Sequence, residues 1–462
     1  MKIHTEKKKN IHWNTMRILA AGFAGAILLG ALLLMLPICN HEPIAFMDAL
    51  FTSTTAICVT GLITIVPMTQ LTVIGKVVLC VLIQIGGLGV IACVTGFFLL
   101  LRRKITLGTR VVIAEAYSAE GPGGMVLMIK NAVLGTFLVE FLGALIYATV
   151  FIPKYGVLKG IGVSVFQSIS SFCNAGIDIV GATSFAAYVS NPVININTML
   201  LIILGGIGFP VWFDVIRNTK RTFKEPVPKK RLFTALQLHS KIALTTTAIL
   251  LVGGTLFILL FEYHNQKTMG NLALHDKVMS AAFQSVTART AGYYTLPQDV
   301  LHDETKFLTV ILMLIGGSPG GTAGGIKTTT MAMLVLTAFS FIRGGTDTEA
   351  FGRQITKENF RTGFTVVMLV GTVYIVGTIA LLMIESDQIP FIDILYETAS
   401  AMGTVGLSAN LTPSLSRASQ LVLIMMMYLG RIGPLTFALV FGGKALAKDH
   451  YRELPKRRIL IG

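Results

Sequence analysis

The sequence predicts an all-α membrane protein that crosses the bilayer many times and is built from four internal repeats. Three observations lead to this fold class: an apolar composition, long runs without charge, and a short motif that recurs four times at nearly constant spacing. Hydrophobic residues make up 53% of the 462 residues. Charged residues make up 13%, about half the share of ~25% in soluble domains. So few charges exclude a soluble enzyme, a secreted disulfide scaffold and a disordered chain.

Eight segments are long and apolar enough to cross the bilayer. A spanning helix needs ~20 predominantly apolar residues. Backbone groups in lipid must be satisfied within the segment, so these spans are helices rather than barrel strands. Six of them contain no charged residue, while 125–153 contains Lys130 and Glu140 and 418–443 contains Arg431. The predicted spans are 18–41, 77–101, 125–153, 179–213, 242–261, 307–326, 362–384 and 418–443.

The net charge of +15 is placed unevenly along the chain. Basic residues gather before the first span and after the second, fourth, sixth and eighth. Because basic clusters mark the cytoplasmic side of a bilayer, we expect a multi-pass protein of the cytoplasmic membrane with both termini in the cytoplasm. The charge therefore indicates topology, and no nucleic-acid partner is expected. The clusters lie at 2–17, 102–110, 217–231, 343–361 and 444–458.

A short motif recurs four times. Each copy starts with an aromatic, a polar and a hydroxyl residue, at 51–53, 166–168, 283–285 and 396–398. A glycine follows nine or ten residues after each aromatic, and these glycines are 115, 116 and 114 residues apart. A second glycine cluster follows 24 to 29 residues later, at 86–89, 205–208, 316–320 and 430–433. One unit therefore occurs four times: spanning helix, half-helix, glycine turn and second spanning helix.

The repeat predicts four covalently linked units in a pseudo-fourfold arrangement around one central pore. Irregular backbone at membrane depth is tolerated only where it is buried in protein or lines a wet cavity, and four turns around one axis meet this condition. We expect Asp48, Ser164, Ser280 and Asp393 to cap half-helices of about ten residues. The predicted units are 1–110, 111–232, 233–345 and 346–462.

The glycine turns are the candidate cation-binding site. A glycine at a fixed place indicates a positive φ or a close approach. Alternating left- and right-handed residues would direct successive carbonyl oxygens to a common axis, where oxygen rings replace the water shell of a cation. The half-helices would point their negative C-terminal ends at the same axis. The residues of the turns, all uncharged, are Val59, Thr60, Gly61, Asn174, Ala175, Gly176, Thr290, Ala291, Gly292, Thr404, Val405 and Gly406.

Four charged residues lie near the turns or inside a span. We expect Glu397 and Arg289 to pair behind the turns. Asp178 fits either an outer vestibule that attracts cations or a solvated loop. Glu140 is expected to pair with a neighbouring helix, with a proton or sodium relay as the alternative. Because the acids form no ring, a hard monovalent cation is favoured over a divalent one.

The third unit departs from the others. Seven of the ten residues 316–325 are Gly or Pro, which a continuous helix disfavours. The stretch fails the nucleotide-binding pattern because Ile326 separates Gly325 from Lys327. We expect it to cross the pore as a loop below the turns, with Lys327 and Arg431 ~20 Å inside the membrane. Isolated cations there cost at least ~2.5 kcal/mol and are functional candidates, although Lys327 also suits snorkelling to water. The candidate loop residues are Gly316, Gly317, Ser318, Pro319, Gly320, Gly321, Thr322, Gly324, Gly325 and Lys327.

Over residues 15–445 the chain resembles the Ktr/Trk/HKT superfamily of potassium transporters, and most of all the integral membrane subunit of bacterial Ktr systems. The resemblance implies that the four turns form a potassium selectivity filter, with potassium bound at Thr60, Asn174, Thr290 and Thr404. It also implies that 316–327 is a gating loop met by Arg431. Gly61 stands where sodium-preferring members carry serine, which favours potassium. The segments that carry the resemblance are 60–62, 173–176, 287–292, 403–407 and 431–436.

The resemblance further implies a homodimer in membrane lipid and a cytoplasmic ring of nucleotide-binding RCK/KTN regulatory subunits. The basic segments 217–231, 343–361 and 444–458 are the expected docking faces. No organic cofactor is expected in this chain, and its five cysteines have no zinc or disulfide spacing. Sodium as a coupling or activating ion stays open.

Three alternatives remain. The first is a sodium-permeable or sodium-coupled member of the same superfamily. The second is a secondary carrier, such as a symporter with inverted repeats, which is disfavoured because all four units run in the same direction. The third is a membrane enzyme, which is disfavoured because the eight histidines lie in or beside predicted loops and form no cluster.

Overall fold

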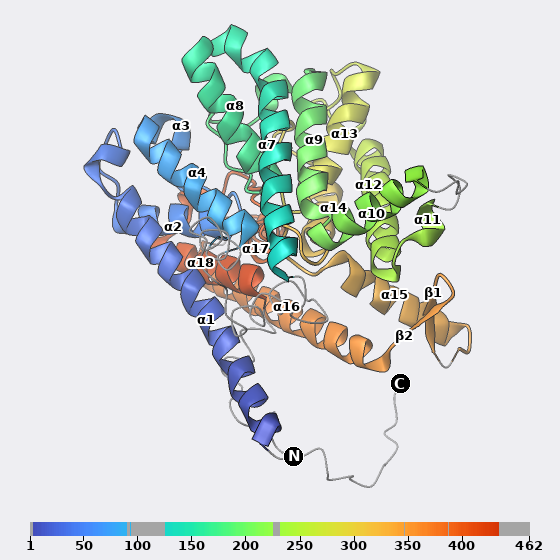
Figure 1. Ribbon diagram of the computed structural model, residues 1–462. Coiled ribbons are helices and arrows are strands. Elements are labelled where there is room, and N and C mark those ends of the chain that lie inside the picture. Colours follow the sequence, from blue (N-terminus) through green and yellow to red (C-terminus); the bar gives the residue numbers. More distant parts are fainter. Residues whose placement is uncertain are drawn as a thin grey trace.

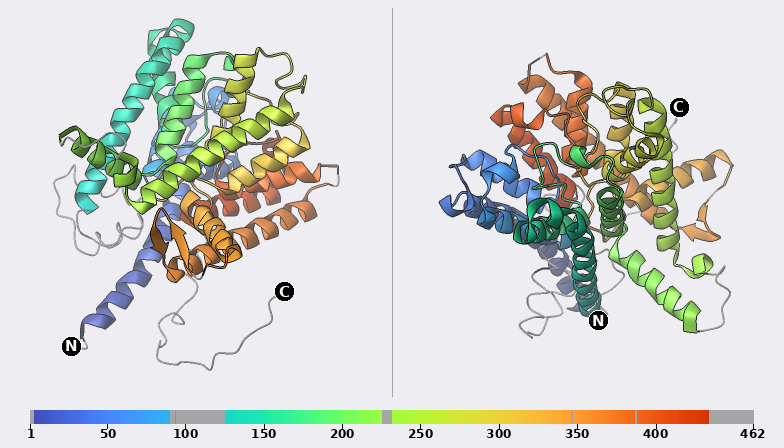
Figure 2. Two further views of the ribbon diagram at one scale, coloured as in Figure 1. Left: turned by 90° about the vertical axis from the view of Figure 1, so that its right-hand side faces the viewer. Right: turned by 90° about the horizontal axis from the view of Figure 1, so that it is seen from above.

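The computed structural model describes residues 3–89, 93, 125–224, 232–345, 347–386 and 388–433. These residues form a bundle of helices with one small pair of strands (Figure 1). The helical fold expected from the uncharged runs is confirmed. Seen from above, the blue, green, yellow and red parts of the chain each occupy their own sector of the molecule (Figure 2, right).

One order of elements occurs four times: a long helix, a shorter helix, a turn and a further helix. The long helices are α1 (Ile3–Leu34), α7 (Met125–Tyr155), α12 (Leu238–Glu262) and α16 (Lys357–Ile384). The shorter helices are α2 (Phe46–Ile57), α8 (Val157–Phe172), α13 (Leu274–Thr287) and α17 (Phe391–Gly403). The helices that follow the turns are α4 (Val73–Leu88), α9 (Pro192–Gly206), α14 (Asp303–Leu314) and α18 (Arg417–Ile432).

The remaining elements are short or extend two of the last helices. After α9 comes α10 (Phe209–Lys224), and after α14 comes α15 (Thr328–Ile342). Strands β1 (Thr348–Ala350) and β2 (Arg353–Ile355) pair antiparallel, with Thr348 opposite Ile355. The other short elements are α3 (Pro67–Gln70), α11 (Leu232–Ala235) and the 3-10 turns Pro37–Cys39, Ala186–Tyr188 and Thr412–Ser414.

By length and composition, three of the described helical segments can cross a membrane: Val126–Tyr155, Leu238–Glu262 and Lys357–Ile384. A fourth crossing results if α9 and α10, which are bent by 98° at a short break, are counted as one span. Large apolar side chains on their outer faces are exposed, as for Leu260 on α12 at 68% and Met383 on α16 at 81%, which suits contact with lipid. Predicted spans 77–101 and 418–443 extend beyond the described residues.

Two predicted spans are interrupted. The prediction of one continuous helix is wrong for 179–213, whereas the break within 307–326 agrees with the loop expected from its Gly and Pro residues. In 179–213, α9 begins only at Pro192 and ends at Gly206. Gly208 has a φ of 92°, which an α-helix does not continue, and Pro210 is tolerated in the first turn of α10. In 307–326, α14 ends at Leu314 and the chain continues as the glycine-rich loop.

The repeated motif docks each short helix on the long helix before it. Its aromatic residue is buried in every copy. Its hydroxyl bonds a backbone carbonyl of the long helix in three copies and the Thr378 hydroxyl in the fourth. These bonds are Ser53 Oγ to Ile27 O at 2.7 Å, Ser168 Oγ to Glu140 O at 2.6 Å, Ser285 Oγ to Leu251 O at 2.9 Å and Thr398 Oγ1 to Thr378 Oγ1 at 2.9 Å. The spacing of the motif therefore reflects one helix contact made four times.

Candidate functional site

The four turns share one backbone pattern. In each, the first and third residues are left-handed, whereas the residue between them is not. The first residues are Val59, Asn174, Thr290 and Thr404, with φ of 54°, 60°, 81° and 52°. The third residues are Gly61, Gly176, Gly292 and Gly406, with φ of 102°, 64°, 87° and 97°. A left-handed Val or Thr costs ~1–3 kcal/mol, and such strain gathers at functional sites.

Hydrogen bonds to the end of each short helix hold this conformation. The amides of Thr60, Ala175 and Val405 each donate to a carbonyl five residues earlier at 2.8 Å. The third turn is one residue shorter, so Ala291 N donates to Thr287 O, four residues earlier, at 2.9 Å. Helix hydroxyls add further bonds to the turns, such as Gly61 N to Thr55 Oγ1 at 2.8 Å. The backbone of each turn is therefore fixed by its own helix.

The four glycines lie against one another in cyclic order. A Cβ built on Gly61 would lie 2.7 Å from the Ala175 carbonyl oxygen, and one on Gly292 would lie 2.6 Å from the Val405 carbonyl oxygen. Cβ atoms on Gly176 and Gly406 would meet the carbonyl oxygens of Ala291 and Thr60. Each glycine thus approaches the middle carbonyl of the next turn, and the fourth approaches the first. A side chain at any of these positions would force the neighbouring backbone to shift.

Four side-chain oxygens at the turns are buried and have no hydrogen-bond partner: Thr60 Oγ1, Asn174 Oδ1, Thr290 Oγ1 and Thr404 Oγ1. Their residues are at most 1% exposed. Buried polar groups in proteins are nearly always bonded, so four such oxygens from four separate turns mark a place suited to a cation. All four are neutral. Among the described residues, no group of His, Cys, Asp and Glu is suited to hold a metal ion.

The loop 316–327 is folded on itself and lies against the turns. Gly316 N donates to Ile326 O at 2.9 Å, and Ile326 N donates to Leu314 O at 3.0 Å. A Cβ on Gly324 would meet the Thr404 hydroxyl, and Asn174 Nδ2 donates to Thr322 Oγ1 at 3.1 Å. The loop therefore contacts the turns of the second and fourth units.

The bend between α9 and α10 anchors the same loop. Ser318 N donates to Gly206 O at 2.8 Å and Thr322 N to Gly205 O at 3.1 Å. In return, Phe209 N donates to Gly320 O at 3.1 Å. The last carbonyls of a helix lack intrahelical partners, and here two of the acceptor carbonyls lie at the end of α9. The break in α9 thus provides the attachment for the loop.

Two cationic side chains also bind the loop. Arg431 of α18 donates to the carbonyls of Thr322 in the loop and Gly86 at the end of α4. Lys327, at the start of α15, donates from Nζ to Ala323 O at 2.5 Å. Arg431 therefore connects three units, and Lys327 points into the loop rather than out to solvent.

A family model described as TrkH, cation transport protein, matches residues 5–451. The chain belongs to this family. It is 38% identical to Ktr system potassium uptake protein B of Bacillus subtilis (strain 168), over 97% of this chain and 98% of the relative. It is 36% identical to potassium/sodium uptake protein NtpJ of Enterococcus hirae, over 99% of both. The resemblance inferred from the motifs is confirmed, and membership of a family of cation transport proteins agrees with a non-enzyme.

A solved structure has the same fold. The crystal structure of the potassium transporter TrkH from Vibrio parahaemolyticus matches with a TM-score of 0.71, over 93% of this chain and 84% of that one. The sequences are 17% identical, so this comparison concerns the fold alone.

Some predicted roles of charged residues are wrong. Glu397 and Arg289 do not pair: the Glu397 carboxylate accepts from Ser408 Oγ, from the Thr412 hydroxyl at 3.0 Å and from two backbone amides. Arg289 Nη2 instead donates to Gly316 O at 3.1 Å. In the fold, both side chains therefore bond to neutral groups and not to each other. Glu140 has no cationic partner among the described residues, and its Oε1 accepts from the Cys173 thiol at 3.8 Å.

The predicted caps are also wrong, because the short helices begin earlier. They have 12, 16, 14 and 13 residues, which leaves Ser164 and Ser280 inside α8 and α13. Asp48 and Asp393 lie in the first turn of α2 and α17, where a carboxylate favours the positive end of the helix. Apolar residues at the helix starts, such as Val157 and Leu274, carried no cap signal.

Asp178 is partly exposed, two residues after Gly176, and its Oδ1 accepts from Val180 N at 3.2 Å. The repeat identified the glycine cluster 205–208 but did not predict a helix break or a contact with the loop there, although Gly208 shortly before Pro210 signals a break. Predicted docking segment 444–458 lies outside the described residues, as does 225–231.

Proposed function

We propose that this protein takes up potassium across the cytoplasmic membrane, through a selectivity filter that the four turns form around one central pore. The observation that carries the proposal is the fourfold recurrence of alternating φ, together with unpartnered neutral oxygens at Thr60, Asn174, Thr290 and Thr404. The names of the relatives, a potassium uptake protein and a potassium/sodium uptake protein, support potassium as the cargo.

The filter exchanges water for protein oxygen. A potassium ion entering the turns leaves its hydration shell and gains carbonyl and hydroxyl oxygens, which cost little reorganisation because the backbone is already fixed. The C-terminal ends of α2, α8, α13 and α17 lead into the turns and add negative potential. The cyclic glycine contacts support a pseudo-fourfold arrangement of units 1–110, 111–232, 233–345 and 346–462.

Gly61 favours potassium over sodium in this proposal. Any side chain here would meet the Ala175 carbonyl oxygen and disturb a ring of oxygens. The four turns are not identical, and only the fourth is Thr-Val-Gly. We therefore expect some sodium passage, and the role of sodium as a coupling or activating ion is decided by flux measurements.

The loop 316–327 acts as the gate. It contacts the turns at Asn174 and Thr404 and carries Lys327 within it. Arg431 holds it to α4, so positive charge and backbone both oppose cation passage until the loop moves. Regulation by a cytoplasmic ring of nucleotide-binding subunits, docked on a homodimer, is part of the same proposal. The described parts of the expected docking faces are 217–224, 343–345 and 347–361.

Cation flux in proteoliposomes tests the filter. Purified protein is assayed with potassium or sodium gradients, with valinomycin-treated and empty vesicles as references. We expect potassium flux to exceed sodium flux, and Gly61→Ser to reduce the preference. Gly253→Ser is the matched control, because a Cβ at Gly253 on α12 meets nothing within 4 Å.

Equal fluxes of the two ions would remove the selectivity claim. A loss of preference in both serine variants would show that position 61 has no special role. If neither ion moves, with or without an added regulatory subunit, the transport proposal fails.

A further inference from the structure

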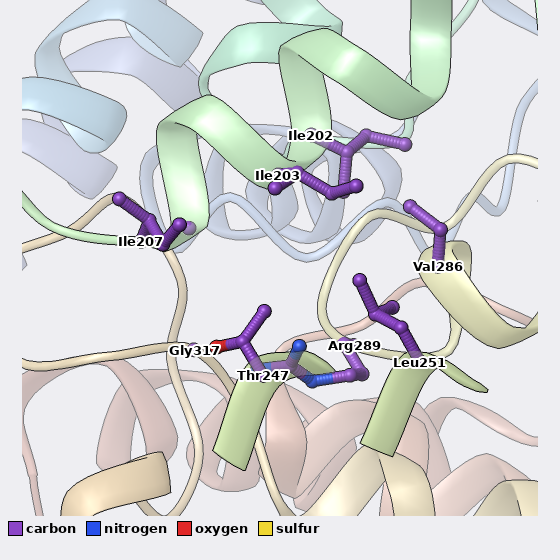
Figure 3. A pocket seen from close by; sticks show the side chains of 9 residues that line it. Ile202, Ile203, Ile207, Thr247, Leu251, Val286, Arg289 and Gly317 are labelled. Carbon is purple, nitrogen blue, oxygen red and sulfur yellow. The ribbon is translucent and has the colours of Figure 1, made fainter. Parts of the chain in front are cut away.

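A pocket lies between α9 and α12, beside the third turn and the start of the loop (Figure 3). Its walls are the apolar side chains of Ile202, Ile203, Leu251 and Val286. Its empty space, including the open mouth, is about 270 Å³. Most of this space belongs to the open mouth, and the enclosed part admits a group of about the size of one water, such as a hydroxyl.

Two buried polar atoms in the pocket have no partner. Thr247 Oγ1 and Arg289 Nε make no hydrogen bond, and both residues are 7% exposed. In Figure 3 both side chains lie on the side of the pocket opposite Ile202 and Ile203. The other end of Arg289 is occupied, since Nη2 donates to Gly316 O. The pocket therefore offers one spare N–H donor and one hydroxyl within apolar walls.

We propose that this pocket binds a small neutral alcohol from the bilayer. The alcohol oxygen accepts a hydrogen bond from Arg289 Nε, and the alcohol O–H donates one to Thr247 Oγ1. The carbon chain packs on Ile202, Ile203 and Leu251 and leaves through the mouth. Burying a polar donor without a partner is unfavourable, so an oxygen-bearing ligand is preferred to an alkane.

The neutral class of ligand follows from the route to the pocket. Leu200 and Leu204 on α9 and Ile249 and Val252 on α12 are 38% to 65% exposed and apolar, as expected of surfaces that face lipid. An ion would be costly to bring through hydrocarbon. A neutral alcohol partitions into the bilayer and reaches the mouth directly.

Occupancy of the pocket would restrain the loop, and this part rests on the proposed function. Gly317 lines the pocket and Gly316 accepts from Arg289, so the empty space is the room into which this end of the loop can move. A bound alcohol fills that room. We expect it to lower potassium flux.

Photolabelling in proteoliposomes tests binding without reference to transport. The probe is octanol carrying a diazirine on its chain, and labelled residues are mapped by mass spectrometry. We expect saturable labelling within 202–207 or 247–251 that excess unlabelled octanol removes. The same diazirine on octane, which lacks the oxygen, should label about 25-fold less, as expected for the loss of about two hydrogen bonds.

Three variants locate the site. Ile203→Phe fills the pocket and should abolish the labelling. Thr247→Val keeps the volume and should weaken labelling about fivefold, the effect of about one hydrogen bond. Leu260→Phe, on the exposed face of α12 away from the pocket, should leave it unchanged.

Unchanged labelling in Ile203→Phe, or equal labelling by octane and octanol, would overturn the site. Saturable labelling that octanol removes, without any change in potassium flux, would overturn the restraint on the loop and keep the site. Absence of flux from untreated protein would instead concern the proposed function.

Discussion

Asp178 lies two residues after Gly176 of the second turn. Burial raises the pKa of this carboxyl to about 6, against hydrogen bonds from Val180, Ser184 and Gly181 that lower it. Its negative charge is therefore present at pH 7.5 and lost on going to pH 5. Between its ordinary value and about 6 the folded state binds more protons than the unfolded state, so rising pH through this window reduces stability.

Potassium uptake at low potassium should fall several-fold from pH 7.5 to pH 5, because a vestibule carboxylate concentrates cations near the turns. Asp178→Asn should have the low uptake at both pH values. Asp303→Asn, at an exposed position of α14, is the matched control and should keep the wild-type pH profile. An unchanged profile in Asp178→Asn would place this carboxyl outside the ion path.

Glu140 is a buried carboxyl whose Oε2 has no hydrogen-bond partner. Because an unpartnered charge is costly to bury, Glu140→Gln should keep or raise the melting temperature and leave potassium flux intact. Glu262 is the matched control, since its carboxylate accepts from Thr305, Thr268, Asn265 and the His302 amide. Glu262→Gln should cost ~1–3 kcal/mol. Loss of flux in folded Glu140→Gln would favour the relay that the sequence left open.

At the scale of elements, the positions of the four turns could be predicted from the sequence. Of the two helix breaks, only the one after α14 was predicted. A glycine at fixed distance from a hydroxyl motif reports a conformation that few residues adopt, so the positions of the four turns follow from spacing. The bend between α9 and α10 has the same apolar composition as a straight span. The sequence signal for the bend is limited to Gly208 and Pro210, and a hydropathy value averaged over a whole span does not detect it.

The charged partners were less predictable for a physical reason. The Glu397 carboxylate accepts hydrogen bonds from a backbone amide and a hydroxyl, and Arg289 donates to a backbone carbonyl. Backbone groups occur at almost every residue, and hydroxyls at many. Sequence patterns identify opposite charges readily but do not show which neutral groups the fold brings near. The contact of Arg431 with the loop was reached through the family resemblance, not through spacing.

The loop and α18 provide a prediction about gating. Arg431 bonds both Thr322 and Gly86, so Arg431→Ala should release the loop and raise basal potassium flux several-fold. Arg431→Lys keeps the charge but cannot bond two carbonyls with the same planar fork, and should give an intermediate flux. Lys267→Ala, at an exposed position outside these contacts and the docking segments, should behave like wild type. Unchanged flux in folded Arg431→Ala would contradict the gate.

At the scale of the whole molecule, the units are joined by a recurring contact. An Asp in the first turn of a short helix meets the region where the last helix of the preceding unit begins. In the fourth unit, Asp393 pairs with Lys306 at 2.6 Å, and in the first, Asp48 pairs with Arg417 at 2.6 Å. In the third, Asp276 accepts from Ser190 at 2.7 Å. The pair of Asp48 and Arg417 therefore links the first unit to the last.

The two ion pairs, Lys306 with Asp393 and Arg417 with Asp48, should contribute differently to stability because they differ in burial. Lys306 and Asp393 side chains are 5% and 17% exposed, whereas Arg417 is 55% exposed. Removing one partner of a buried pair leaves an uncompensated charge and costs ~3–5 kcal/mol. An exposed pair contributes ~0–1 kcal/mol. Lys306→Met should therefore lower the melting temperature in detergent far more than Arg417→Met does.

A double-mutant cycle separates the pair from the cost of each substitution. Lys306→Met combined with Asp393→Leu should destabilise less than the sum of the single changes, because no charge is left unpaired. The same cycle at Arg417 and Asp48 should be close to additive. Additive effects at Lys306 and Asp393 would show that the two units are held by apolar packing alone. Strong coupling would make this joint a structural link between the third unit, which carries the loop, and the fourth, which carries Arg431.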